Sequence, residues 1–246
     1  MAKNPPSHES EGRMEKKGQI QRLFSVLSPN YDLFDTLFSL GVDRFWREMA
    51  AARMPGHGPF LDLCAGTLEL SLALLGKGAR KGWVAAVDFC PEMLLQGRMK
   101  LGGNPLRERV TILAGDGEHI PLKGDCFQGA MIGFGLRNLT DREAGLRELW
   151  RVLKPGGRVV VLEFSDPVSP LFRQLYYCYF CHILTPLGNL FSGKLMPFTH
   201  LRDSVLAFPG KDELAAMMEE AGFVRVRYQL LTCGIAAIHW GDKPSE

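Results

Sequence analysis

Residues 131–167, MIGFGLRNLTDREAGLRELWRVLKPGGRVVVLEFSDP, decide the fold of this chain. An apolar run ends in a turn with glycines, and apolar residues then recur every three or four positions, which predicts a helix with one buried face. Lys154-Pro155-Gly156-Gly157 ends that helix, and residues 158–164 are too apolar to have a solvated face. The sequence therefore predicts a strand–helix–strand crossover, with 133–138 and 163–166 on the rim of a site at the carboxyl ends of the strands.

The same alternation of strands and helices extends through most of the chain. Further strands are predicted at 60–64, 82–87, 110–114 and 127–134, and a closing antiparallel pair at 223–230 and 235–240. Helical pieces broken at Ser28-Pro29 precede the sheet, and an aromatic-rich helical insertion at about 167–208 follows its fifth strand. The predicted fold class is α/β: a doubly wound, mostly parallel, Rossmann-like sheet of seven strands with an antiparallel last strand.

Length and composition indicate one globular domain. The chain has 246 residues, of which 46% are hydrophobic and 23% charged, and its formal net charge is +2. The first 18 residues are polar and contain Pro5-Pro6, so we expect a disordered tail over 1–18 and a single domain over 19–246. The 29 basic residues are scattered among 27 acidic ones, which argues against nucleic-acid binding.

No secretory signal or membrane span is evident, so we expect a cytoplasmic protein with reduced cysteines. Cys178 and Cys181 form a C-x-x-C pair, but no second pair of Cys or His residues stands at metal-ligand spacing. We therefore predict no metal site and expect small molecules as partners.

Three predicted strands end in residues that suit an adenosine group. These residues are Asp62, Gly66, Thr67, Asp88, Asp116 and Gly117. Asp88 lies about 20 residues past Thr67, where a carboxylate can accept from both ribose hydroxyls. Asp116 can accept from an adenine amino group, and Gly117 leaves the ring access to the backbone. Each residue alone is equally an ordinary cap or turn, but together, at consecutive strand ends, they predict an adenosine cofactor.

The glycine content of the first turn distinguishes between adenosine cofactors. A dinucleotide site needs G-x-G-x-x-G to hold a pyrophosphate, and Cys64-Ala65-Gly66-Thr67-Leu68-Glu69 lacks that pattern. S-adenosylmethionine has no phosphates and needs fewer glycines. The sequence therefore favours S-adenosylmethionine.

Motifs spread over most of the chain resemble one family. They include Ser39-Leu-Gly-Val-Asp-Arg-Phe-Trp-Arg47, Asp88-Phe-Cys-Pro-Glu-Met-Leu94, Phe134-Gly-Leu-Arg-Asn138, Arg151-Val-Leu-Lys-Pro-Gly-Gly157 and Leu162-Glu-Phe-Ser165. The chain resembles class I S-adenosylmethionine-dependent methyltransferases and, among them, the menaquinone/ubiquinone biosynthesis C-methyltransferases. That family methylates a ring carbon of a polyprenyl hydroquinone.

The resemblance implies S-adenosylmethionine as the cofactor and S-adenosylhomocysteine as its product. Its cofactor contacts fall on Thr67, Asp88, Asp116 and Gly117, and on Gly133, where relatives often have Ser. Leu68 stands where the family usually has Gly, and it would be strained or obstructive if that position needs a positive φ. Two alternatives therefore stay open: a methyltransferase for another small molecule, and a non-catalytic protein that binds cofactor or quinone.

Carbon methylation of a hydroquinone requires the reduced ring, because the oxidised quinone is itself an electrophile. A group that stabilises the developing phenolate, or removes its proton, typically accelerates such a step by about 10²–10⁴-fold. Arg137 and Asn138, on the predicted rim, are the first candidates to hold that oxygen; the alternative is a salt bridge and a turn cap. His200 is a further candidate, with Arg202, Tyr31 and Asp32 also able to face the pocket, and a structural histidine is the alternative at position 200.

The insertion is dense in aromatic residues, among them Tyr176, Tyr179, Phe180 and Phe198. We expect part of this set to be core and part to line a channel for a prenyl tail or to rest on a bilayer. The expected partners are a polyprenyl naphthoquinol or benzoquinol and, transiently, the inner face of a membrane, without an anchor. The sequence leaves the quinol class and a homo-oligomer open.

Overall fold

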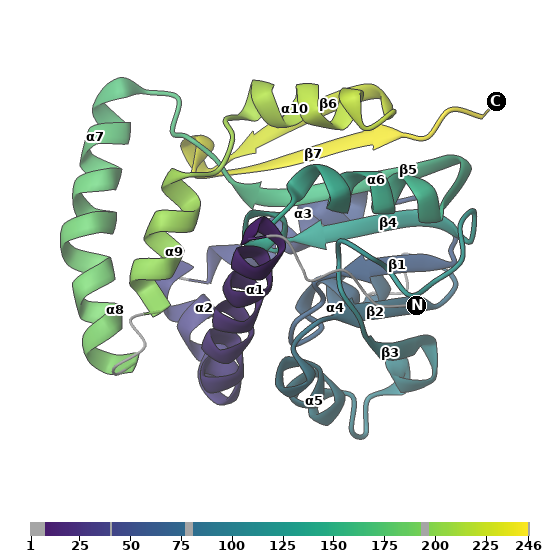
Figure 1. Ribbon diagram of the computed structural model, residues 1–246, viewed down its shortest axis with the longest axis horizontal. Coiled ribbons are helices and arrows are strands. Elements are labelled where there is room, and N and C mark those ends of the chain that lie inside the picture. The colour runs from purple at the N-terminus through teal and green to yellow at the C-terminus, as the bar shows by residue number, and fades with distance from the viewer. Residues whose placement is uncertain (1–7, 40, 77–80, 193–196, 246) are drawn as a thin grey trace.

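A seven-stranded sheet forms the centre of the computed structural model, which describes residues 8–39, 41–76, 81–192 and 197–245 (Figure 1). The strand order is β3-β2-β1-β4-β5-β7-β6. The strands are β1 Phe60–Leu63, β2 Val84–Asp88, β3 Val110–Ala114, β4 Phe127–Gly133, β5 Leu153–Phe164, β6 Val224–Leu231 and β7 Ala236–Asp242. The first five are parallel, and β7 runs antiparallel to both of its neighbours, which confirms the predicted fold class.

Helices cover both faces of the sheet, and its inner strands β1 and β2 are buried along their whole length. One face packs on α3 (Val42–Arg53) and α4 (Glu69–Leu75) through Trp46, Leu70 and Leu74. The other face packs on α6 (Arg142–Val152) and α10 (Lys211–Glu220) through leucines of both helices. Also present are α5 (Pro91–Lys100) and the 3-10 turns η3 (Pro105–Arg109), η4 (Leu136–Asn138) and η6 (Thr232–Gly234).

The crossover from β4 through α6 to β5 has the predicted order, but β5 begins earlier than expected. The pairing of β4 with β5 shifts register between Phe127, opposite Leu153, and Gly129, opposite Arg158. Lys154-Pro155-Gly156-Gly157 is therefore an irregularity inside the strand rather than a turn that precedes it. Gly156, at φ 75°, supplies the backbone conformation that this irregularity needs.

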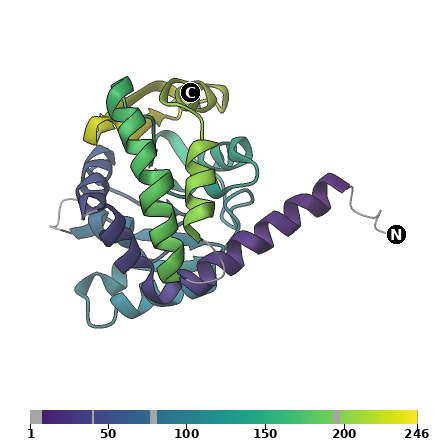
Figure 2. The same cartoon turned by 90° about the vertical axis from the view of Figure 1, so that its left-hand side faces the viewer.

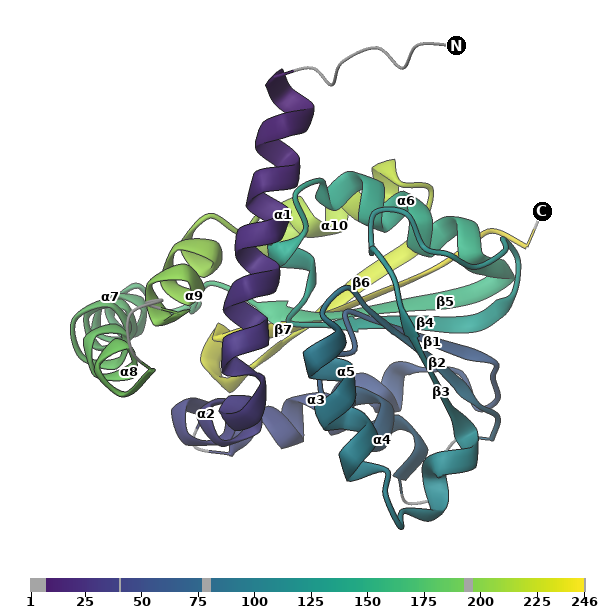
Figure 3. The ribbon, with the colours of Figure 1, turned by 60° about the horizontal axis from the view of Figure 1, so that its bottom comes forward.

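The prediction of a disordered tail is wrong for residues 8–18, which belong to helix α1 (His8–Leu27). Figure 3 shows α1 extending beyond the body of the molecule at its N-terminal end. The ammonium group of Lys17 lies 2.7 Å from a carboxylate oxygen of Asp116 and 2.8 Å from one of Glu118. These ion pairs join segments about 100 residues apart, so the composition of the first residues gives no sign of them. Residues 1–7 lie outside the described residues.

The break predicted at Ser28-Pro29 is confirmed as the 3-10 turn η1 (Ser28–Asn30), which separates α1 from α2 (Tyr31–Ser39). The insertion forms α7 (Pro170–Tyr179), the π-helical turn η5 (Phe180–Leu184), α8 (Thr185–Ser192) and α9 (Pro197–Leu206). Phe180 and Leu184 of η5 form a separate apolar cluster with Phe198 and Val205 of α9, and Tyr176 of α7 packs against it. Among the described helices, none is long and apolar enough to cross a membrane.

The start of α6 provides a test of this local structure. Asp141 is its N-cap, and a carboxylate oxygen of Asp141 accepts a hydrogen bond of 2.9 Å from the N–H of Ala144. We expect Asp141→Ala to lower the free energy of unfolding by about 1 kcal/mol, because it leaves a helix-end N–H without its acceptor. Asp141→Asn keeps an acceptor and should cost much less; equal losses in urea unfolding would contradict the capping role.

Candidate active site

Two cavities lie at the carboxyl ends of the parallel strands. The larger has a volume of about 320 Å³ and lies between the N-terminal helices, the ends of β4 and β5, and the insertion. Most of its wall is apolar; its polar residues include Tyr31, Asp35, Arg137, Asn138 and His200. This volume and lining are typical of a site for a small organic ligand. We call it the acceptor cavity.

The second cavity is a crevice of about 20 Å³ at the ends of β1, β2 and β3. Asp88, Asp116 and Gly117 line it, as predicted for cofactor-binding residues, together with Lys17 and Ile20 of α1. Asn138 lines both cavities, so the two meet there. We call this the cofactor crevice.

The two carboxylates of the crevice have different surroundings. Asp88 is buried and accepts hydrogen bonds of 2.8 Å from the N–H groups of Gly66 and Cys90. Burial raises the pKa of Asp88, and these backbone donors oppose that shift. Burial acts in the same direction on Asp116, but the ion pair with Lys17 and the N–H of Glu118 hold the pKa of Asp116 below its ordinary value.

Four other predicted cofactor residues do not line the crevice. They are Asp62, Gly66, Thr67 and Gly133. Burial raises the pKa of Asp62 to about 7, and its carboxylate accepts a 2.6 Å hydrogen bond from Ser71. Thr67 donates a 2.6 Å hydrogen bond to Asp32 of α2. A Cβ at Gly133 would lie 3.0 Å from Leu70, so a side chain there would point toward α4.

The residues of the crevice fit an adenosine group in chemistry, although α1 fills the space. Asp88 and Asp116 provide acceptors for ribose hydroxyls and an amino group, and a Cβ at Gly117 would lie only 3.2 Å from Leu139. A volume of about 20 Å³ holds roughly one water molecule. Lys17 and Ile20 of α1 line this small space, so we expect α1 to shift when an adenosine group binds.

Leu68 stands where the family usually has Gly, and its φ is indeed positive, at 70°. Its side chain is fully buried in a cluster with Ala65, Ala86 and Leu101 and lines neither cavity. Gly97 of α5 makes room for it, since a Cβ at Gly97 would lie 2.5 Å from Cγ of Leu68. Leu68 thus has the strained conformation but does not obstruct either cavity.

Arg137 lines the acceptor cavity and also forms the salt bridge that was its alternative role. Its guanidinium group lies 3.0 Å from a carboxylate oxygen of Glu163, and both side chains are buried. The same group lies 5.1 Å from the ring centre of Phe164 and 5.8 Å from that of Phe134. Among the described residues, the buried Nε–H of Arg137 has no hydrogen-bond partner. An unpaired buried donor costs about 1–3 kcal/mol, which a bound acceptor oxygen would relieve.

Asn138 and His200 lie on the same cavity wall as Arg137. Nε2 of His200 lies 3.1 Å from Oδ1 of Asn138, so the carbonyl oxygen accepts a proton held on Nε2. Burial, and next the charge of Arg137, lower the pKa of His200. The imidazole is then neutral near pH 7, and with the proton on Nε2 its Nδ1 is the nitrogen able to accept one. The structure brings the three predicted catalytic residues together, whereas Arg202 and Asp32 line neither cavity.

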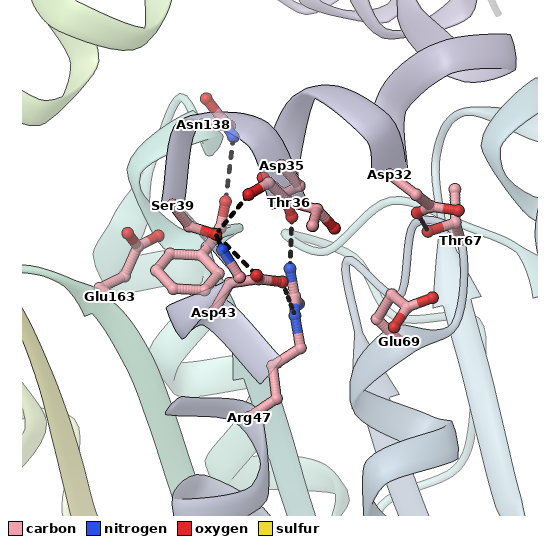
Figure 4. Close-up of polar contacts among 12 residues, drawn as sticks. Asp32, Asp35, Thr36, Ser39, Asp43, Arg47, Thr67, Glu69, Asn138 and Glu163 are labelled. Atoms are coloured by element: carbon pink, nitrogen blue, oxygen red, sulfur yellow. Dashed lines mark hydrogen bonds and ion pairs between the residues drawn. The ribbon is translucent and has the colours of Figure 1, made fainter. Parts of the chain in front are cut away.

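An ionic cluster in the acceptor cavity was not predicted (Figure 4). The buried guanidinium group of Arg47 contacts Asp35 at 2.5 Å and Asp43 at 3.4 Å, and Ser39 donates a 2.7 Å hydrogen bond to Asp43. Burial raises the pKa of Asp35, and Arg47 opposes that shift. Asp43 and Arg47 are four positions apart on one helix, a spacing from which their ion pair could have been predicted. Nothing in the sequence pairs Arg47 with Asp35, which belongs to another helix.

The strand order is that of the class I S-adenosylmethionine-dependent methyltransferase fold, and the crevice residues suit that cofactor. Solved structures have the same fold: a SAM-dependent methyltransferase of Thermotoga maritima matches with a TM-score of 0.61 at 19% identity, covering 90% of this chain and 99% of that one. A putative S-adenosyl-L-methionine-dependent methyltransferase of Methanococcus maripaludis matches with a TM-score of 0.54 at 17% identity, and the match covers 100% of this chain and 98% of that one.

The chain belongs to the ubiE/COQ5 methyltransferase family, whose family model matches residues 12–243. A demethylmenaquinone methyltransferase of Deinococcus radiodurans is 43% identical over 94% of this chain and 96% of its own length. A ubiquinone/menaquinone biosynthesis C-methyltransferase of Geobacter sulfurreducens is 41% identical over 94% of this chain and 91% of its own length. The resemblance inferred from the motifs is therefore confirmed.

The contact between α1 and the crevice leads to a prediction about cofactor affinity. We expect Lys17→Ala to tighten S-adenosylmethionine binding by about two- to tenfold, because it removes partly exposed ion pairs that hold α1 over the crevice. Isothermal titration calorimetry measures this change. Arg22→Ala, at an exposed position on the same helix, is the matched control and should bind as the wild type does. Weaker binding by the Lys17 variant would show that Lys17 belongs to the cofactor site.

Proposed function

We propose that this methyltransferase transfers a methyl group from S-adenosylmethionine to a ring carbon of a polyprenyl quinol, for example demethylmenaquinol to menaquinol. The names of the relatives support this acceptor: one is a demethylmenaquinone methyltransferase at 43% identity and another a ubiquinone/menaquinone biosynthesis C-methyltransferase. A naphthoquinol and a benzoquinol both suit the proposal.

The observation that carries the proposal is the shared wall of the two cavities. Asn138 lines both, so a ring beside Asn138 in the acceptor cavity would lie next to the cofactor crevice. Arg137 and His200 provide polar groups at that end, while Tyr176 and Phe180 belong to an apolar wall that suits a prenyl tail. An amphipathic acceptor with a polar ring and an apolar tail matches this lining.

The chain's own residues would act on the hydroxyl group of the acceptor. When bound, S-adenosylmethionine would supply an electrophilic methyl group and leave as S-adenosylhomocysteine, and the ring carbon that receives the methyl group would lose its hydrogen as a proton to solvent. Arg137 would donate its unpaired Nε–H to the ring oxygen as negative charge develops there. His200 would accept the hydroxyl proton on Nδ1 while Asn138 holds its Nε2–H. The apolar wall would exclude water and keep the ring oriented. No metal takes part in this proposal.

A turnover assay tests the function. Purified protein with labelled S-adenosylmethionine and a chemically reduced quinol, of each class in turn, should give labelled methylated quinol. Labelled product from another small molecule, with none from quinols, would favour a different acceptor. Cofactor binding without any turnover would contradict the proposal and indicate a non-catalytic protein that binds the cofactor.

The role of Arg137 can be separated from its structural pairing. We expect Arg137→Gln to lower kcat with the quinol by at least about 10²-fold, because the charge that stabilises the ring oxygen is lost. The affinity for S-adenosylmethionine should stay within about twofold, since Arg137 does not line the crevice. Arg202→Gln, in the insertion but outside both cavities, is the matched control. Equal losses of turnover and cofactor affinity, together with a lower melting temperature, would return Arg137 to a structural role.

The state of His200 predicts the acid side of the pH profile. Its lowered folded-state pKa keeps the base neutral at pH 7, so kcat should fall only as the pH drops below the ordinary value of about 6.5. The His200→Gln variant should have a lower kcat, and its kcat should not decrease further as the pH drops below about 6.5. The same acid fall in both proteins would assign the titration to another group and exclude His200 as the base.

A further inference from the structure

The outer side of the insertion has a continuous row of exposed apolar side chains. Helices α7 and α8 are joined through the π-helical turn η5 into one rod, which Figure 2 shows facing the viewer, away from the sheet. Large apolar residues at intervals of four or three positions on this rod are between 44% and 75% exposed. They are Leu171, Leu175, Tyr179, Ile183, Leu187 and Leu190. We call this row the outer stripe.

The π-helical turn explains why the row stays on one side. In a regular α-helix, positions four apart are rotated by about 40°, so a long series with that spacing would wind around the helix. The turn Phe180–Leu184 takes more residues per turn and offsets this rotation midway along the rod. Between the exposed positions, Tyr176, Phe180 and Leu184 face the acceptor cavity. The rod therefore has an outer side along its length and, from Tyr176 to Leu184, a side that faces the cavity.

The outer stripe reaches the acceptor cavity at one residue. Tyr179 is 44% exposed and also lines the cavity. A molecule that lies along the stripe therefore meets the cavity wall at Tyr179. An exposed tyrosine at such a boundary has an apolar ring and a polar hydroxyl, which suits the junction of lipid and water.

The charges around the stripe restrict what can cover it. The sequence contains no Asp or Glu between Asp166 and Asp203, and the exposed Arg173 lies on α7 itself. A surface without acidic groups is not repelled by anionic lipid headgroups, and basic groups near such a surface add attraction. A stretch of contiguous exposed apolar groups marks an interaction site rather than ordinary surface.

We propose that the outer stripe docks on an anionic lipid bilayer, with the rod lying in the plane of the interface. The rod has 23 residues from Pro170 to Ser192 and would extend about 35 Å along the bilayer surface. Its leucines enter the acyl region, as in other amphipathic helices that lie on membranes. This docking rests on the proposed function, because it delivers a lipid acceptor from the bilayer to the cavity beside Tyr179.

Vesicle binding tests the docking directly. Leu171→Ser, Leu175→Ser and Leu187→Ser together remove apolar side chains from the stripe and leave the cavity lining intact. The wild type should co-sediment with vesicles of mixed phosphatidylglycerol and phosphatidylcholine, and the triple variant should bind at least about tenfold more weakly. Binding should also weaken on pure phosphatidylcholine, because the electrostatic attraction is lost.

The matched control removes exposed apolar side chains elsewhere. Leu95 and Met99 on α5 are 56% and 66% exposed and line neither cavity, so Leu95→Ser/Met99→Ser should bind vesicles as the wild type does. Equal weakening in the control, or vesicle binding by the triple variant at the wild-type level, would overturn the proposal. A wild-type dimer that becomes monomeric in the triple variant, with vesicle binding unchanged, would assign the stripe to a second copy of the chain.

Two acceptors separate this proposal from the proposed function. With a long-chain quinol embedded in vesicles, the triple variant should lose at least about tenfold in turnover, matching its loss of vesicle binding. With a short-chain quinol free in solution, it should retain the wild-type kcat and KM, because the cavity is unchanged. If the wild type methylates neither quinol, the proposed function fails, while the vesicle-binding result still decides the docking.

Discussion

The buried ion pair between Arg137 and Glu163 is the interaction on which the rest of the site depends. Glu163 lies at the end of β5 and Arg137 in the turn after β4, so the pair joins the carboxyl ends of two neighbouring strands. Phe134 and Phe164 contact the guanidinium group and exclude water from it. A buried charge without its partner is strongly destabilising, so each residue needs the other. The pair fixes the turn that carries Asn138, and with it the wall shared by the two cavities.

A single helix, α1, lines both cavities, which links the two sites physically. Lys17 and Ile20 of α1 line the cofactor crevice, and Leu23, Phe24 and Leu27 line the acceptor cavity. The 3-10 turn η1 separates this helix from α2, whose Asp32 accepts a hydrogen bond from Thr67 in the first strand-to-helix turn. A displacement of α1 that admits a cofactor would therefore also alter the wall of the acceptor cavity.

The cofactor side was predictable to the extent that it depends on strand ends. Asp88, Asp116 and Gly117 meet in the crevice because consecutive parallel strands end at the same edge of the sheet. The cluster of Arg47 with Asp35 and Asp43 was not predictable, because it depends on how two helices cross. The same limitation explains the error at residues 8–18, where the ion-pair partners of Lys17 come from distant turns.

The sequence by itself determined the fold class, the class of cofactor and the family, because periodicity, strand-end residues and motifs are local properties of the chain. It also identified Arg137, Asn138 and His200 as candidates. Only the tertiary structure decided that Asn138 borders both cavities, that Gly97 makes room for Leu68, and that α1 covers the crevice. These features arise from contacts between segments far apart in the chain, whose geometry no local pattern encodes.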